Sequence, residues 1–203
     1  MLLNQRLKKY TIILASQSPR RQHLLKEMGI DFEVRTNGNS DESYPENLDY
    51  TEIPVFLARK KAEPFTGKLL ANEILITSDT IVYCNGSIIG KPTNRQNAID
   101  LLKQLSGRKH VVVTGIEITH PNHSRSFSAF TDVYFRKLSE DEIEFYVDTF
   151  KPYDKAGAYG IQEWIGYIGV ERIDGSYFNV MGLPVQKLYM ELNHFIDELE
   201  ENK

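Results

Sequence analysis

The 203-residue sequence contains a single cysteine, Cys84, so it can form neither an intrachain disulfide nor a zinc site made of cysteines. It also lacks an excess of positive charge. The 24 Lys and Arg against 28 Asp and Glu give a formal net charge of −4, which argues against a chain-wide nucleic-acid surface. No apolar run approaches the roughly 18–20 residues that cross a bilayer, and the N-terminal stretch MLLNQRLKKY lacks the apolar core of a signal peptide. We therefore expect a cytoplasmic protein with no membrane or nucleic-acid partner.

The composition is that of an ordinary globular protein, with 41% apolar and 26% charged residues, and its length allows one large domain or two small ones. Strands and helices alternate early and strands cluster in the middle, which favours a mixed α/β sheet flanked by helices. The predicted strands are 11–15, both arms of a hairpin within 73–92, 110–118, 126–135 and 166–173. The predicted helices are 19–28, 54–64, one from about 94 that Gly107 ends, 140–147, and a last one that begins near 184.

The stretch SQSPRRQHLL places two arginines at the start of a predicted helix. Ser18 suits the N-cap and Pro19 the first helical position, which leaves Arg20 and Arg21 in the first turn. The helix dipole favours acids there by roughly 0.3–1 kcal/mol, so the arginines need another explanation. One is a solvated helix face. The other is an anion site, formed by the outward N–H groups of the helix, the hydroxyls of Ser16 and Ser18, and the two guanidinium groups.

Asp79 is a carboxylate in the middle of an apolar β run, where acids are rare. The Asn-Gly dipeptide at 85–86 predicts a two-residue hairpin turn that places Thr80 opposite Lys91, with Asp79 one step away. Strict alternation puts Asp79 and Lys91 on opposite faces; either a bulge at Gly90 brings them together, or the strands end there. A structural ion pair and a functional site explain this Asp–Thr–Lys neighbourhood equally well.

The glycine-bearing segment KPYDKAGAYGIQE is predicted to be a loop whose backbone can approach a ligand closely. Lys155 and Gln162 in it are suited to contact a phosphate and a base edge, although a plain connection is the more common explanation for such a loop. Glu42 lies in a polar stretch and indicates little by itself. His120 and His123 flank a predicted hairpin loop without an obvious third ligand, so we expect no metal site there.

Six segments in this order together resemble the Maf family of nucleoside triphosphate pyrophosphatases over nearly the whole chain: LASQSPRRQHLL, LARKKA, SDTIVYCNGSIIGKP, LSGRKHVVVTG, DKAGAYGIQ and GSYFNVMGLP. The resemblance implies one elongated mixed α/β domain over 1–203, with residues 1–10 as a short extension and a deep nucleotide-binding cleft, as in inosine triphosphatase-like folds. It further implies a cytoplasmic enzyme, commonly a homodimer, that uses Mg²⁺ or Mn²⁺ to cleave a nucleoside triphosphate between its α- and β-phosphates.

The same resemblance implies roles for individual residues. Asp79 matches the acid regarded as the proton acceptor, and Glu42 matches a less sharply defined acid that we expect to hold the metal together with Asp79. The other expected catalytic residues are Ser16, Arg21, Lys61 and Lys91. The residues expected to bind the substrate and set specificity are Arg20, Thr80 and Gln162, with Lys155 supporting the loop or a phosphate.

The AGAYGIQ segment resembles the branch of the family that prefers dTTP and UTP, not the branch that prefers 7-methyl-GTP. Two departures accompany it: Ser78 stands where Ala is usual, and Glu163 follows Gln162 where the family pattern has Gly. The expected function is therefore hydrolysis of dTTP and UTP, a house-cleaning role that extends to modified pyrimidine nucleotides and to arrest of cell division. The alternatives are a 7-methyl-GTP pyrophosphatase and a non-catalytic nucleotide-binding regulator of septum formation. Asp79 discriminates against a pure binder, because a carboxylate beside phosphates needs a catalytic or metal-binding reason.

Overall fold

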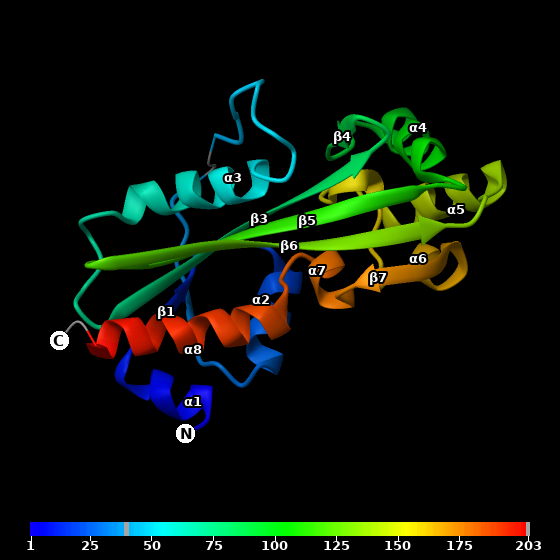
Figure 1. Cartoon of the computed structure of the whole chain (residues 1–203). Helices are drawn as coiled ribbons and strands as arrows, with labels where there is room; N and C mark the ends of the chain where they lie inside the picture. The colour runs from blue at the N-terminus through cyan, green and yellow to red at the C-terminus, as the bar shows by residue number, and fades with distance from the viewer. Residues whose placement is uncertain (39–40, 202–203) are drawn as a thin grey trace. The chain divides into compact units, whose positions relative to one another are not determined.

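The computed structural model describes residues 1–38 and 41–201, and these form a mixed sheet in the order β2-β1-β3-β5-β6-β7, with β4 paired to β3 (Figure 1). The strands are β1 Thr11–Leu14, β2 Glu33–Val34, β3 Glu73–Cys84, β4 Ser87–Ile89, β5 Lys109–His120, β6 His123–Phe135 and β7 Val170–Gly175. The helices are α1 Leu3–Arg6, α2 Pro19–Glu27, α3 Ile53–Ala62, α4 Arg95–Leu105, α5 Glu140–Phe150, α6 Trp164–Gly169, α7 Tyr177–Met181 and α8 Val185–Glu201. Three 3₁₀ turns, η1 Leu7–Lys9, η2 Glu63–Phe65 and η3 Ala156–Ala158, complete the chain. The mixed α/β class predicted from the sequence is confirmed.

The chain divides into two compact units, each assembled from separate stretches of sequence. Unit 1 contains residues 1–79, 114–129 and 182 onward, and unit 2 contains residues 80–113 and 130–181. The strands β3, β5 and β6 contribute residues to both. Neither unit is therefore a contiguous stretch of chain that could be cut out of the sequence, and the single domain over 1–203 stays a prediction.

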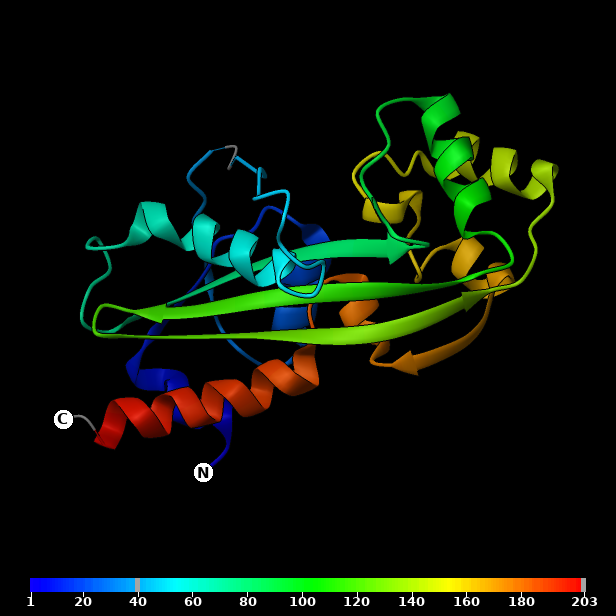
Figure 2. The same cartoon turned by 45° about the horizontal axis from the view of Figure 1, so that its top comes forward.

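In unit 1, β1 runs parallel to both of its neighbours, with Ile13 opposite Glu33 on β2 and Leu75 on β3. The helices α3 and α8 lie on opposite faces of the strands of this unit (Figures 1 and 2). Gly115 on β5 allows α3 to approach closely, because a Cβ added there would lie 2.2 Å from the carbonyl carbon of Pro54. The start of α3 is thus set by a backbone contact that only glycine permits.

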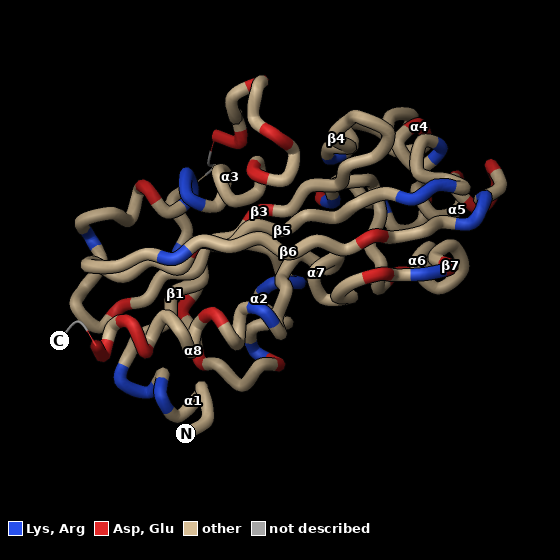
Figure 3. Tube along the Cα trace, in the orientation of Figure 1, with Lys and Arg blue, Asp and Glu red and all other residues tan. Residues whose placement is uncertain are grey.

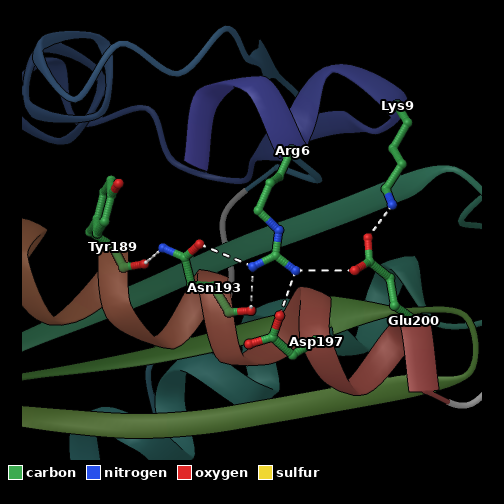
Figure 4. Close-up of polar contacts among 6 residues, drawn as sticks. All are labelled: Arg6, Lys9, Tyr189, Asn193, Asp197 and Glu200. Atoms are coloured by element: carbon green, nitrogen blue, oxygen red, sulfur yellow. Dashed lines mark hydrogen bonds and ion pairs between the residues drawn. The ribbon is translucent and has the colours of Figure 1, made fainter. Parts of the chain in front are cut away.

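Residues 1–10 fold back on the C-terminal half of α8 (Figure 4). The Arg6 guanidinium donates to Asp197 at 2.6 Å, to Glu200 at 3.2 Å and to the Asn193 side chain at 3.2 Å. Leu3 on the same segment is buried. The short N-terminal extension expected from the sequence is therefore tied to the last helix by the branched ion pair of Arg6 and by the ion pair of Lys9 with Glu200.

In unit 2, the hairpin predicted at the Asn-Gly dipeptide is confirmed, with Cys84 opposite Ser87 and Val82 opposite Ile89. The turn residues have φ of 48° and 81°, the left-handed values of a type I′ turn. The helix predicted over 140–147 begins with a capping box, because Ser139 Oγ accepts the N–H of Glu142 and the Glu142 carboxylate accepts the N–H of Ser139. Local sequence chemistry accounts for both features.

The prediction of one strand over 166–173 is wrong, because Trp164–Gly169 forms helix α6 and β7 begins only at Val170. The buried residues Ile165 and Gly169 lie four apart, a helical spacing that a short apolar run does not distinguish from a strand. Helix α7, with five residues, was not predicted because it is too short for periodicity to reveal. Across residues 1–38 and 41–201, no helix combines the length and the apolar character needed to cross a membrane.

Candidate functional site

The turn between β1 and α2 is held by Ser16, not by the residue at the N-cap. Ser18 occupies the N-cap position with Pro19 after it, as predicted, but its side chain makes no capping bond to the described residues. Instead, Ser16 Oγ accepts the N–H of Ser18 at 3.2 Å, and Gln22 Nε2 donates to the Ser16 carbonyl at 3.1 Å. These bonds tie the first turn of α2 to the end of β1, which places the first-turn side chains.

Arg21 is oriented by main-chain carbonyls that lie far away in the sequence. Its Nε donates to the Gly182 carbonyl at 2.8 Å, and its Nη1 donates to the Ser78 carbonyl at 2.9 Å and to Ser16 Oγ at 3.5 Å. Burial lowers the pKa of Arg21 from its ordinary value, while the nearby Asp79 carboxylate raises it. These bonds fix the direction of the guanidinium, as an anion-binding arginine requires.

Asp79 follows Ser78 directly and is 7% exposed. Lys61 on the last turn of α3 donates a short hydrogen bond to Asp79 Oδ1, and its Nζ lies 3.5 Å from Glu42 Oε1. One turn earlier on α3, the Ala58 carbonyl accepts from Thr77 Oγ1 at 2.7 Å, which joins α3 to β3. Figure 3 shows basic residues on both α2 and α3, the two helices that supply cations to this site.

Unit 1 therefore brings together five of the predicted residues in two linked groups. The first group is Arg21 with Ser16, and the second is Lys61 with Glu42 and Asp79. The two groups are linked because Arg21 donates to the carbonyl of Ser78, the residue before Asp79. Arg20 lies in the same first turn of α2 and is half-buried. The members of this site are Ser16, Arg20, Arg21, Glu42, Lys61 and Asp79.

The carboxylates of Asp79 and Glu42 meet at the Lys61 ammonium, so they are the residues of this unit that could hold a cation. Within the described residues, no group of three or more His, Cys, Asp or Glu side chains is placed to hold a metal ion. Mg²⁺ commonly binds through only one or two carboxylates and completes its coordination with water and substrate phosphates. The oxygen donors present therefore fit a hard divalent cation that shares its ligands with a phosphate.

The remaining predicted residues, Thr80, Lys91, Lys155 and Gln162, belong to unit 2. The sequence allowed either a bulge at Gly90 or an end of the strands there. The hairpin ladder ends at Ile89, so the strands end before Lys91, and Lys91 is exposed. Within unit 1, Lys61 forms an ion pair with Asp79. The expected neighbourhood of Asp79 and Lys91, which belong to different units, stays a prediction.

The loop after α5 holds Lys155 and Gln162 in unlike surroundings. Lys155 is 8% exposed and donates to Asp154 at 2.7 Å, with Glu163 Oε1 3.1 Å away. Gln162 Oε1 is buried, and no described residue donates a hydrogen bond to it. A buried amide oxygen without a donor is costly, which makes this atom a candidate acceptor for a ligand.

Sequence reasoning missed the groups that position these side chains. The carbonyls of Gly182 and Ser78 hold Arg21, yet a main-chain carbonyl has no signature in a sequence. Tyr146 on α5 bonds the loop of unit 2 at Gly160 and at Glu163. Glu163 stood out in the sequence as a departure from the family pattern but its partners did not, and Tyr146 is indistinguishable from an ordinary core residue of α5.

The model of the Maf-like protein family matches residues 11–195. A dTTP/UTP pyrophosphatase of Parabacteroides distasonis is 54% identical over 191 residues, which cover 94% of this chain and 99% of that protein. A dTTP/UTP pyrophosphatase of Bacteroides fragilis (strain YCH46) is 54% identical over 192 residues, which cover 95% and 98%. Among solved structures, a HAM1 protein from Coxiella burnetii has a TM-score of 0.49 at 17% identity over 91% of this chain and 99% of that one, which is too low to assign a fold.

Proposed function

The chain belongs to the Maf family, and from that premise we propose that it hydrolyses dTTP and UTP at the bond between the α- and β-phosphates, giving the monophosphate and pyrophosphate. The observation that carries this proposal is the arrangement around Ser78 and Asp79. Arg21 is held by the carbonyl of the residue that precedes a buried carboxylate, and Lys61 donates to that carboxylate. The names of the relatives, dTTP/UTP pyrophosphatases, support the choice of dTTP and UTP.

In this mechanism Asp79 accepts the proton of the water that attacks the α-phosphorus. The Lys61 ammonium donates to the Asp79 carboxylate and orients it, and Arg21 stabilises negative charge that develops on the phosphates. Ser16 and the N–H groups at the start of α2 add donors for the same anion. Lys91 is proposed to bind the leaving pyrophosphate.

Glu42 and Asp79 would hold Mg²⁺ or Mn²⁺, whose bound charge offsets that of the phosphate oxygens. This chain's own cations, Arg21 and Lys61, act on the same oxygens, so they lower the charge that the metal has to offset. A cytoplasmic location, a homodimer and a house-cleaning role in the cell, all expected from the resemblance, stay predictions.

The base is proposed to be read by Gln162, together with Arg20 and Thr80. The buried Gln162 Oε1 is an acceptor, and thymine and uracil each present an imide N–H that can donate to such an oxygen. Lys155 is held by the carboxylates of Asp154 and Glu163, the latter next to Gln162 in the sequence, and supports the loop. Because a site with an unpaired polar atom discriminates strongly, loss of this contact should cost selectivity more than rate.

The test is pyrophosphate release from dTTP, UTP, CTP, GTP and 7-methyl-GTP with Mg²⁺ or Mn²⁺. We expect fastest release from dTTP and UTP, and a loss of roughly 10²–10⁴-fold in Asp79→Asn because the general base is removed. Asp148→Asn, on the exposed side of α5, is the matched control and should leave the rate unchanged.

Each contrary result identifies a different error in the proposal. Fastest release from 7-methyl-GTP would favour the first alternative. Nucleotide binding without release from any triphosphate would favour the non-catalytic regulator. An Asp79→Asn variant within a few-fold of the wild type would refute the assignment of the base.

A further inference from the structure

A four-residue turn, Gly160–Glu163, presents Gln162. The Glu163 N–H donates to the Gly160 carbonyl at 2.9 Å and closes the turn, with Gln162 at one of its two central positions. Tyr146, fully buried on α5, joins the two ends of this turn. Its hydroxyl accepts the N–H of Gly160 at 3.0 Å and donates a short hydrogen bond to Glu163 Oε2. One phenol therefore bonds the backbone at Gly160 and the side chain of Glu163, on either side of Gln162.

The second oxygen of the same carboxylate faces Lys155. Glu163 Oε1 lies 3.1 Å from Lys155 Nζ, whose other bond is to Asp154 on the adjacent residue. The Lys155 side chain is nearly buried, so its ammonium depends on these carboxylates for the contacts that water would otherwise supply. Glu163 thus contacts both Lys155 and the Tyr146 hydroxyl that joins the ends of the turn.

The local structure is shaped to admit this carboxylate. A Cβ added at Gly160 would lie 2.7 Å from Glu163 Cδ and 2.9 Å from Glu163 Oε2, so the glycine makes room for the side chain. Burial and the neighbouring carboxylate raise the pKa of Tyr146 well above its ordinary value. The hydroxyl therefore keeps its proton and remains a donor to Glu163 throughout the physiological pH range.

We propose that Glu163, the residue that departs from the family pattern, is a positioning residue that holds Lys155 and Gln162 in their nucleotide-reading geometry and thereby sets nucleotide selectivity. This inference rests on the proposed function for its substrates. Glu163 acts through its neighbours: Oε1 holds the ammonium, and Oε2 holds the phenol that clamps the turn. A structural role alone would change stability, whereas a positioning role changes affinity for one base relative to another.

The experiment compares Glu163→Gln, Lys155→Met and the double variant with the wild type. Glutamine keeps the size of the side chain and an acceptor for Tyr146 but removes the charge that holds Lys155. We expect KM for dTTP to rise about tenfold with kcat within about threefold, because charged hydrogen bonds contribute more than neutral ones. In the Lys155→Met background, Glu163→Gln should add less than about twofold.

Selectivity is measured by calorimetry with the α,β-methylene analogues of dTTP and GTP, which bind without being cleaved. Glu163→Gln should lower the dTTP-to-GTP affinity ratio at least about fivefold, and Tyr146→Phe should do the same because it releases the turn. Glu144→Gln, an exposed glutamate of α5 paired with Arg95, is the matched control and should leave the ratio unchanged. Thermal unfolding establishes that each variant is folded.

The possible outcomes separate this inference from the proposed function. A wild type that releases no pyrophosphate refutes the proposed function, while the analogue affinities still test Glu163. An unchanged affinity ratio, an unchanged or lower KM, or additive effects in the double variant overturn the positioning role. A fall in thermal stability with an unchanged ratio also overturns it, because Glu163 would then act only on the fold.

Discussion

Replacing His110 by glutamine should flatten the dependence of folding stability on pH. His110 lies on β5, is 1% exposed, and places Nε2 2.7 Å from the hydroxyl of Tyr159. Its ring packs edge-on against Phe135, with centroids 5.1 Å apart. Burial lowers the pKa of His110 from 6.5 to about 4, opposed only by the more distant Asp132 carboxylate. The imidazole is therefore neutral in the folded chain at pH values where an exposed histidine is charged.

The sign of the effect follows from which state binds the proton. Between pH 6.5 and about 4 the unfolded chain protonates His110 and the folded chain does not, so stability falls as the pH falls through this window. At 1.36 kcal/mol for each unit by which the two pKa values differ, the full effect is about 3 kcal/mol, of which about 2.5 kcal/mol is expressed by pH 4.5. Above about pH 7.5 both states are neutral, and the contribution no longer changes.

The assay is urea unfolding of the wild type and of His110→Gln between pH 4.5 and 7.5. Glutamine can still hydrogen-bond to Tyr159 but does not titrate, so the wild type should lose about 2.5 kcal/mol more than the variant over this range. The exposed His194→Gln should behave as the wild type. Subtracting the stability curve of His110→Gln from that of the wild type removes the contribution of carboxylates that titrate in both proteins. Parallel pH curves for wild type and His110→Gln would refute the reasoning.

Two further predictions concern Arg21 and the N-terminal segment. Arg21→Ala should lower kcat/KM by roughly 10²–10³-fold because it removes an oriented donor from the phosphates, whereas Arg20→Ala should change the order of preference among nucleotides. Steady-state kinetics on the triphosphate panel measures both effects. Equal effects of the two variants would contradict this division of roles. Arg6→Ala should lower the melting temperature by about 2–4 °C because it removes the half-buried bridge to Asp197 and Glu200, and a melting curve that is unchanged at low salt would contradict this contribution.

Local chemistry explains why several elements were predictable. The hairpin after β3 depends on an Asn-Gly pair that adopts positive φ, and the start of α5 depends on the reciprocal bonds of Ser139 and Glu142. Helix α8 buries Leu188 and Leu192 at the spacing that its sequence displays. Helix α6 was missed for the opposite reason, because six residues are too few for helical and strand periods to differ.

The family could be recognised from the sequence by itself, because motifs such as LASQSPRR and SDTIV carry the resemblance, and the same motifs named the candidate site residues. Only the tertiary structure decided which groups hold them. Lys61 reaches Asp79 across 18 residues, and Arg21 reaches the Gly182 carbonyl across 161. The physical reason is that every residue except proline carries the same main-chain donor and acceptor, so their use depends on where the backbone passes. The two arginines at the start of α2 illustrate the difference. Their presence could be read from the sequence, whereas the carbonyls that orient Arg21 could not.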